Sequence, residues 1–249
     1  MPSITQDHLI QYENDGFVIV ENFLDTDEDI QPVIDEYTQV LDQLANQLYA
    51  DRKISNVYAN LPFGERLTKV YAESGEVYSQ YFDFSLPQNG VDADTPFWAG
   101  PAVFHMLRHQ KLLDAAESFV GNEIYSNPVQ HIRIKPPEHA LPQTGDNRVI
   151  QTPWHQDNGV LLSEADDGNI LTVWLPLPNA TIEQGCLQVL PGSHKSGLMH
   201  HCYQDNGLAI HNFDEKDALS IPMQAGDVLF MHQLTCHNSL PNVSNAVRI

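Results

Sequence analysis

Positive charge is scarce in this sequence. Its 249 residues include 12 Lys and Arg against 33 Asp and Glu, which gives a formal net charge of −21 with the histidines neutral. Such a surface repels the phosphate backbone of nucleic acid and anionic lipid headgroups. We therefore expect no nucleic-acid partner and no membrane partner, and a large polyanionic substrate such as an acyl-CoA is mildly disfavoured.

Cysteines and long apolar runs are also scarce. The three cysteines, Cys186, Cys202 and Cys236, are odd in number and lack Cys-x-x-Cys spacing, so we expect reduced thiols and no disulfide framework. No stretch approaches the roughly eighteen apolar residues of a membrane span, and residues 1–7 do not resemble a secretion signal. These absences predict a soluble cytoplasmic protein and leave its oligomeric state open.

What is present is the composition of a globular protein. Hydrophobic residues make up 42% of the chain and charged residues 18%, without a low-complexity segment or an internal repeat. A chain of this length can bury a substantial core. We expect one domain over residues 1–249.

Helical spacing dominates residues 1–121. Apolar residues recur at intervals of three and four over residues 5–14, 26–49, 68–82 and 101–120, with a break expected near Gln110 and an end at Gly121. A short strand is expected at residues 17–20, and residues 83–95 read as a loop because of Pro87, Gly90 and several acidic residues. This half of the chain is expected to buttress a sheet.

After Gly121 the hydrophobic period changes to two, which is typical of strands. Strands are expected at residues 125–135, 149–156, 169–177, 186–190, 218–221, 227–232, 236–240 and 246–249. Many short strands separated by turn residues predict a β-sandwich or jelly roll over residues 122–249, with the preceding helices packed on one sheet.

A candidate metal site begins in the segment Trp154-His155-Gln156-Asp157. Side chains two positions apart on a strand point to the same side, so His155 and Asp157 can face one cavity. A second histidine would complete the 2-His-1-carboxylate set that suits non-haem Fe(II) and leaves coordination positions open.

Two histidines compete for the third ligand position, His232 and His237. Arg248 follows His237 by eleven positions, so an adjacent antiparallel strand can carry its guanidinium into the same cavity. Arginine is suited to binding a carboxylate bidentately. This spacing favours His237, and His232 is expected on the opposite face as a core or supporting histidine.

The remaining histidines have no ligand spacing that includes a carboxylate. His194 lies in a turn composition and is expected to stabilise a loop, whereas His200, His201 and His211 are expected at the surface.

Several further segments accompany these residues in a fixed order along the chain. They are Lys135-Pro136-Pro137, His155-Gln156-Asp157, Trp174, the run from Gly185 through Cys186-Leu187-Gln188 to Pro191-Gly192-Ser193-His194-Lys195, Ala225-Gly226-Asp227, and His237-Asn238-Ser239 with Arg248. In these segments, which span about half of the chain from residue 131 onward, the sequence resembles the phytanoyl-CoA dioxygenase family of Fe(II)/2-oxoglutarate oxygenases.

The resemblance implies a double-stranded β-helix and an enzyme that uses Fe(II), 2-oxoglutarate and O2. Such an enzyme hydroxylates an unactivated carbon of a small molecule and releases succinate and CO2. By resemblance, His155, Asp157 and His237 bind iron, while Arg248, helped by Lys135, Trp174 and Ser239, binds 2-oxoglutarate. Related halogenases carry a small residue in place of the carboxylate, so Asp157 favours hydroxylation.

Substrate residues are expected from strand alternation. If Lys135 points into the cavity, His131 and Arg133 share its face, whereas Ile132 and Ile134 point toward the helices. His131 and Arg133 are therefore candidate substrate residues. Trp98 and Phe104 of the helical half are further candidates, and residues 163–168 are a candidate lid.

Two other functions fit the same motifs. One is a jelly-roll protein that binds metal without oxygenase turnover, as a sensor or an inactive relative, and the other is a cupin-like zinc hydrolase or isomerase, in which Arg248 has no role. Because only Ile249 follows Arg248, we expect the natural chain or the family pattern to continue. If it does not, Arg248 is expected to be frayed and 2-oxoglutarate binding weak.

Overall fold

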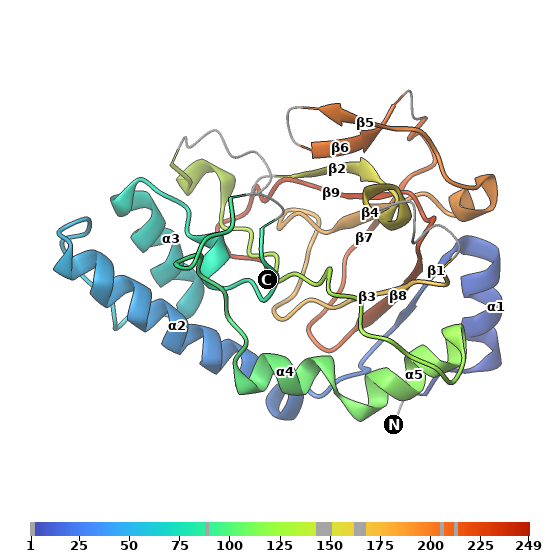
Figure 1. The fold of residues 1–249 in the computed structure, drawn as a ribbon, viewed down its shortest axis with the longest axis horizontal. Helices are drawn as coiled ribbons and strands as arrows, with labels where there is room; N and C mark the ends of the chain where they lie inside the picture. Colours follow the sequence, from blue (N-terminus) through green and yellow to red (C-terminus); the bar gives the residue numbers. More distant parts are fainter. Residues whose placement is uncertain (1–2, 88–89, 143–150, 162–167, 205–206, 212–213) are drawn as a thin grey trace.

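Helices cover one side of a set of antiparallel strands (Figure 1). The computed structural model describes residues 3–87, 90–142, 151–161, 168–204, 207–211 and 214–249. In the view of Figure 1, α2, α4 and α5 run along the lower edge and the strands lie above them toward the right. Among the described helices, none combines the length and apolarity needed to cross a membrane.

The helices follow the predicted order. They are α1 (Gln6–Asp15), a π-helical turn (Thr26–Ile30), α2 (Gln31–Ala50), α3 (Phe63–Ser74), α4 (Pro101–Leu107) and α5 (Gln110–Val120). Short 3-10 turns lie at Ser79–Tyr81, Glu138–Ala140, Asp157–Val160 and Ser193–Ser196. The predicted break near Gln110 is confirmed as the junction between α4 and α5.

Capping residues explain where the N-terminal helices begin and end. The Thr5 hydroxyl accepts the His8 N–H at the start of α1, and Gly16 ends the helix with φ +82°, a value that favours glycine. The prediction for residues 68–82 was shifted, because α3 begins directly after Pro62 and stops at Gly75, whose φ is +74°.

The strands form two principal sheets and a separate hairpin. The first sheet has the order β1 (Phe17–Val20), β8 (Val228–His232), β3 (Leu171–Trp174), and the second has the order β2 (Thr152–His155), β9 (His237–Ser239), β4 (Leu187–Val189), β7 (Leu219–Ile221). The hairpin pairs β5 (His201–Gln204) with β6 (Gly207–Ile210). All of these pairings are antiparallel.

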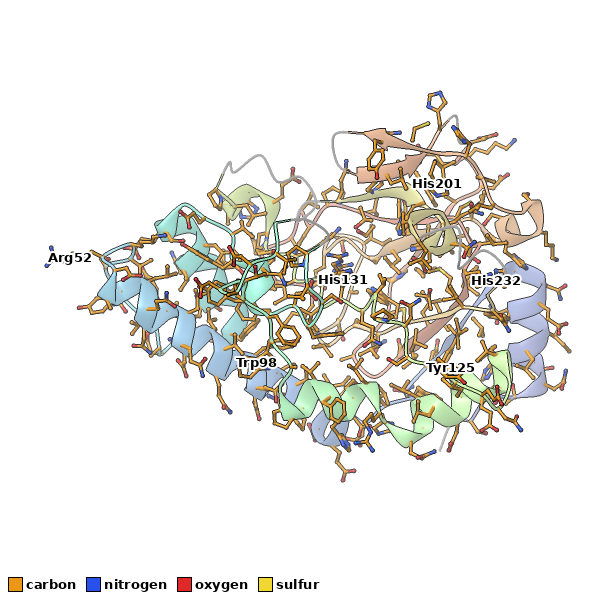
Figure 2. All side chains as sticks on the ribbon, viewed as in Figure 1. Arg52, Trp98, Tyr125, His131, His201 and His232 are labelled. Atoms are coloured by element: carbon orange, nitrogen blue, oxygen red, sulfur yellow. The ribbon has the colours of Figure 1, made fainter. Side chains whose placement is uncertain are left out.

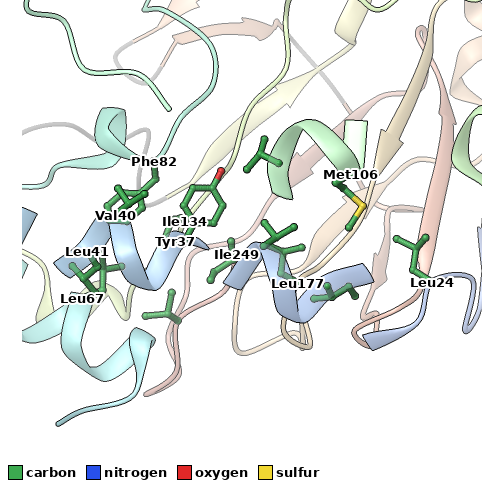
Figure 3. Packing of buried hydrophobic residues seen from close by; sticks show 14 of the residues in the cluster. Leu24, Tyr37, Val40, Leu41, Leu67, Phe82, Met106, Ile134, Leu177 and Ile249 are labelled. Atoms are coloured by element: carbon green, nitrogen blue, oxygen red, sulfur yellow. The ribbon is translucent and has the colours of Figure 1, made fainter. Parts of the chain in front are cut away.

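Alternation along β8 divides the core into two layers. Val228 and Phe230 point to the helices and join a cluster that includes Tyr37, Leu41 and Met106 (Figure 3). Leu229 and Met231 point the other way and pack between the two sheets, with residues such as Phe17, Leu187, Val189 and Ile221. The predicted packing of the N-terminal helices on one sheet is therefore confirmed for the sheet β1-β8-β3.

Two of the expected strands are wrong. Residues 125–135 and 246–249 form no strand, and their only ladder contact is a bridge between Lys135 and Arg248. Side chains replace the strand partner, because Ser85 Oγ and Asp83 Oδ1 accept the backbone N–H groups of Gln130 and Ile132 at 3.1 and 3.4 Å. Pro136 and Pro137 then offer no N–H donors with which to extend a ladder.

The hairpin β5-β6 was not predicted from the sequence. Its first strand, His-Cys-Tyr-Gln, is too polar for the hydrophobic pattern to indicate a strand. The candidate lid at residues 163–168 lies outside the described residues except for Gly168.

Candidate metal centre

Pairing between β2 and β9 brings the predicted ligands together. His155, at the end of β2, lies opposite His237, at the start of β9, and their ring centroids are 4.1 Å apart. Asp157 follows in the 3-10 turn after β2, with Oδ1 at 3.6 Å from Nε2 of each histidine. One ligand atom from each of the three residues lies within 4.8 Å of the others. This is the only such group among the described residues.

Backbone carbonyls fix both imidazole rings. Nδ1 of His155 is 2.9 Å from the Pro153 carbonyl, and Nδ1 of His237 is 3.0 Å from the Thr235 carbonyl. A carbonyl only accepts hydrogen bonds, so each Nδ1 carries the proton and each Nε2 keeps its lone pair. Both lone pairs are then available on the side of Asp157, which is the tautomer that metal binding requires.

Burial and neighbouring groups shift the pKa values of His237 and Asp157 toward the forms that bind a metal. Burial lowers the pKa of His237 to about 4, assisted by the neighbouring His155 and opposed by Asp157. Burial would raise the pKa of Asp157, but His237, His155 and Thr172 together lower it well below its ordinary value. Two imidazole nitrogens and one carboxylate oxygen form a donor set that fits Fe(II).

Thr172 is a site residue that the sequence reasoning missed. Its hydroxyl donates to Oδ2 of Asp157, which leaves Oδ1 facing the histidines. A signal existed in the sequence, because Thr172 stands two positions before Trp174 and so shares its face of β3.

Two buried cations lie beside this centre. Lys135 and Arg248 are 3% and 2% exposed, and none of the described carboxylates forms an ion pair with either. Lys135 Nζ donates to Ser239 Oγ at 2.6 Å and to the Leu240 carbonyl at 2.9 Å. Because Ser239 lies two positions after His237 on β9, the ammonium group lies next to the metal ligands.

The Arg248 guanidinium is held by neutral groups. Its NH1 donates to the Gly185 carbonyl at 3.1 Å, its Cζ lies 5.7 Å from the centre of the Trp174 ring, and its buried Nε has no hydrogen-bond partner. A buried donor without a partner is costly and fits a ligand oxygen. The backbone N–H and carbonyl of Arg248 both bond to Lys135, at 3.0 and 2.7 Å, so the backbone that carries the guanidinium is held in place.

Burial of like charges disfavours both cations in the absence of an anion. Burial, then Arg248 and Arg133, lower the pKa of Lys135 to about 6. Burial, with a contribution from Arg133, lowers the pKa of Arg248 to about 10. A dicarboxylate would relieve this repulsion, so the residues present fit 2-oxoglutarate as well as a metal.

Two of the candidate substrate residues, His131 and Trp98, bond to carboxylates that are not part of the metal and cation groups. His131 Nδ1 lies 2.8 Å from Asp83 Oδ2, and the Trp98 indole N–H donates to Glu36 at 2.8 Å. Figure 2 shows His131 near the middle of the molecule and Trp98 closer to the helices. Ile134 is buried among the helix-facing residues, as alternation predicted, while Arg133 is exposed.

Phe104 is 54% exposed on α4 and lines a shallow apolar pocket of about 220 Å³ with Phe84, Val103 and Leu107. None of the metal or cation residues lines this pocket. Substrate roles for Trp98, Phe104, His131 and Arg133 remain predictions.

The structure also places the other histidines. His232 contacts Tyr12 and His194 and is not among the clustered ligands, so His237 is the third member of the group. His194 lies in a 3-10 turn, with Nε2 at 3.2 Å from the Glu13 carbonyl. The expectation of a surface His201 was wrong, because its Nε2 accepts the backbone N–H of Gln156 at 3.1 Å. All three cysteines are free, as predicted.

Known proteins are similar to this chain in sequence or in fold. The chain is 25% identical to "Phytanoyl-CoA dioxygenase" of Arabidopsis thaliana over 99% of this chain and 86% of that protein. It is 32% identical to a "1-deoxypentalenic acid 11-beta-hydroxylase" of Streptomyces arenae over 56% of this chain, which spans half of that relative's length.

Among solved structures, the fold is similar to that of EvdO2 from Micromonospora carbonacea var. aurantiaca, complexed with 2-oxoglutarate. The TM-score is 0.59 at 18% identity, and the alignment covers 99% of this chain and 88% of EvdO2. The family model described as phytanoyl-CoA dioxygenase matches residues 12–249. The resemblance inferred from the motifs is therefore confirmed, and the chain belongs to the phytanoyl-CoA dioxygenase family of oxygenases that depend on iron and 2-oxoglutarate.

Proposed function

We propose that this chain is a single-domain Fe(II)- and 2-oxoglutarate-dependent dioxygenase that hydroxylates an unactivated carbon of a small molecule. In this proposal the two principal sheets are the walls of a double-stranded β-helix. The observation that carries it is the convergence of His155, Asp157 and His237 beside two buried cations that lack a carboxylate partner among the described residues.

The proposed roles of the residues follow from their contacts. His155 and His237 present Nε2, and Asp157 presents Oδ1, to hold Fe(II). When bound, the metal with 2-oxoglutarate supplies the activation of O2, with release of succinate and CO2. The protein orients the reactants and keeps competing reactions out.

Arg248 and Lys135 bind and orient the cosubstrate. The guanidinium takes the distal carboxylate of 2-oxoglutarate, because its fork matches a carboxylate and its Nε lacks a partner. Lys135 and the Ser239 hydroxyl, 2.6 Å apart, add donors on the β9 side, and the Trp174 ring covers the guanidinium. Holding reactants in a reactive orientation can lower a barrier by roughly 7–11 kcal/mol.

Asp157 bears on the outcome of the reaction. Its carboxylate occupies the position that a halide would need, so hydroxyl transfer is proposed and halide transfer is not. The 1-deoxypentalenic acid hydroxylase among the relatives supports a small-molecule substrate of this class.

The test is anaerobic titration of the purified protein with Fe(II) and 2-oxoglutarate, followed by a screen for compounds that accelerate succinate formation in air. We expect 2-oxoglutarate to bind only when the metal is present, and Arg248→Ala to abolish this binding while metal binding persists. Arg108→Ala, on the exposed surface at the end of α4, is the matched control.

Other outcomes would favour the other functions. Metal and 2-oxoglutarate binding without succinate formation across the screen would favour a metal-binding protein without turnover. Zinc-supported hydrolysis that is unaffected by Arg248→Ala would favour a cupin-like hydrolase instead.

A further inference from the structure

The ligand strand β2 lies at an edge of its sheet. It pairs with β9 on one side only, so its other edge needs partners from outside the sheet. The hairpin β5-β6 packs along this side, and its first strand begins at His201, which is labelled in Figure 2. Gln156, the one residue between the two ligands of this segment, therefore stands where contacts from the hairpin side reach the ligand segment.

His201 supports the Asp157 turn from two sides. Its Nδ1 lies 2.8 Å from the Met199 carbonyl and so carries the proton, which leaves Nε2 to accept the Gln156 N–H at 3.1 Å. The same ring packs against Gly159, where an added Cβ would lie 2.1 Å from Cε1. Asp157 is thus held between two residues that contact one imidazole ring.

Gln156 connects the first two ligands to the third. Its side chain is fully buried and both of its N–H donors and its oxygen are bonded, donating to the Gly197 carbonyl at 2.9 Å and the Leu234 carbonyl at 2.8 Å and accepting the Met199 N–H at 2.7 Å. Leu234 is followed directly by Thr235, whose carbonyl orients the His237 ring. One amide therefore ties the His155–Asp157 segment to the turn that precedes His237.

We propose that Gln156 and His201, which offer no atom to the metal, are positioning residues that set the metal affinity of the centre. They do so by fixing the register between two ligand segments that are about eighty positions apart in the sequence. This inference rests on the proposed iron centre. Partners of this kind, one step removed from a metal, typically contribute about 10- to 100-fold in affinity.

The experiment compares Co(II) binding to the metal-free full-length protein and its variants, followed by the visible ligand-field absorption of Co(II). His201→Phe keeps a ring against Gly159 but removes the acceptor for the Gln156 N–H, and Gln156→Met keeps the length of the side chain but removes its three hydrogen bonds. We expect each to weaken Co(II) binding by about 10- to 100-fold and to change the shape of the absorption band.

Matched controls separate positioning from general damage. His200→Phe changes the exposed histidine that directly precedes His201. Gln188→Met removes a single side-chain hydrogen bond, to Ser220, in the sheet that contains β2. Both controls should leave the Co(II) dissociation constant within about twofold of the unchanged protein, below the effect of a positioning residue. Thermal unfolding of each metal-free protein shows whether it folds.

His201→Gln is the variant to use if His201→Phe does not fold, because its amide oxygen can replace Nε2 as an acceptor. It should recover most of the lost affinity. Co(II) binding by folded His201→Phe and Gln156→Met within about twofold of the unchanged protein would overturn the inference and leave the iron centre intact. Absence of Co(II) binding by the unchanged protein would instead overturn the centre itself.

Discussion

The two principal sheets differ in what they turn toward the space between them. The sheet β1-β8-β3 is covered on both faces, with Val228 and Phe230 against the helices and Leu229 and Met231 against the opposite sheet. The sheet β2-β9-β4-β7 also contributes Leu187, Val189 and Ile221 to this space, but its strands β2 and β9 add His155, His237 and Ser239 on the cation side of the site. The inner face of the first sheet is mainly apolar, with Thr172 as its contact to the site, so this sheet is mainly a support. The β2-β9 side of the second sheet carries the polar groups of the candidate site.

This difference separates stability from chemistry. A buried apolar strand stabilises the fold through the surface it removes from water, whereas buried polar and charged groups stabilise little and can cost free energy until a ligand satisfies them. Changes in the helix-facing apolar layer of the support should therefore lower stability with little effect on binding. Changes on the β2-β9 side of the second sheet should do the reverse.

The largest effect is expected from Asp157→Ala. Loss of the carboxylate removes a ligand, so metal affinity should fall by more than the roughly 100-fold typical of an outer partner, and succinate formation should disappear. The metal-free variant should unfold at a temperature close to that of the unchanged protein. Co(II) titration and thermal unfolding measure the two quantities, with the exposed Asp214→Ala as control. Tight metal binding by the variant would contradict the assignment of Asp157.

Phe230→Ala tests the support sheet, where we expect a loss of stability without a loss of metal affinity. The ring is fully buried and contacts Phe119 and Phe23 at centroid distances of 5.1 and 5.8 Å, so its removal should lower the free energy of unfolding by about 3–5 kcal/mol. Chemical denaturation measures this loss. The half-exposed Phe104→Ala should change it by about 0.5 kcal/mol or less. A folded Phe230→Ala protein that has lost its metal affinity would show that the two sheets are not separable in this way.

The pH dependence of 2-oxoglutarate binding tests the protonation of the buried Lys135 side chain. Burial, then Arg248 and Arg133, hold the pKa of Lys135 at about 6, far below its ordinary value, so the folded protein lacks a proton that the unfolded chain holds above that pH. The free energy of unfolding should accordingly rise with pH between about 6 and the ordinary lysine pKa of about 10.4.

Binding of a dianion should restore that proton. The dissociation constant of 2-oxoglutarate should therefore increase above pH 6, by at most about tenfold per pH unit. Isothermal titration in buffers of different ionisation enthalpy measures the proton uptake, and Lys135→Met should abolish it. Equal affinity from pH 6 to pH 8 with no proton uptake would argue against a neutral Lys135.

Thr172→Val should give the smallest effect. The variant keeps the shape of the side chain but loses the hydrogen bond to Asp157 Oδ2, so the carboxylate is less firmly oriented. We expect about a tenfold loss of Co(II) affinity. Thr38→Val, which removes a hydroxyl bonded to the Ile34 carbonyl within α2, is the control. If the two variants bind Co(II) equally well, the threonine has no role in orienting the ligand.

Local chemistry explains which elements could be predicted. The first helix follows from Thr5 and Gly16, and the strand Phe17–Val20 follows from its continuous apolar run. The segment before Lys135 was mistaken for a strand, because alternation in the sequence does not reveal whether a partner strand is present. Its backbone partners are side chains of Asp83 and Ser85, more than forty positions away.

The candidate centre was predictable to the extent that its residues share a strand or a recognisable spacing. His155 and Asp157 share one face, and the interval from His237 to Arg248 selected the second histidine. Thr172 and His201 carry no such spacing to the ligands. Their contacts arise because β3 and the hairpin β5-β6 pack beside β2 and its turn.

The sequence by itself determined the ligand set, the two cations and the alternation that separates a helix-facing layer from an inter-sheet layer. These properties depend on residue type and on periods of two or 3.6 residues, which the chain carries locally. The tertiary structure alone decided which nitrogen of each histidine faces Asp157, which hydroxyl orients Asp157 and which groups lie against the cations. Those outcomes depend on single hydrogen bonds between distant segments, such as Lys135 with Ser239, and only the folded packing brings such groups within bonding distance.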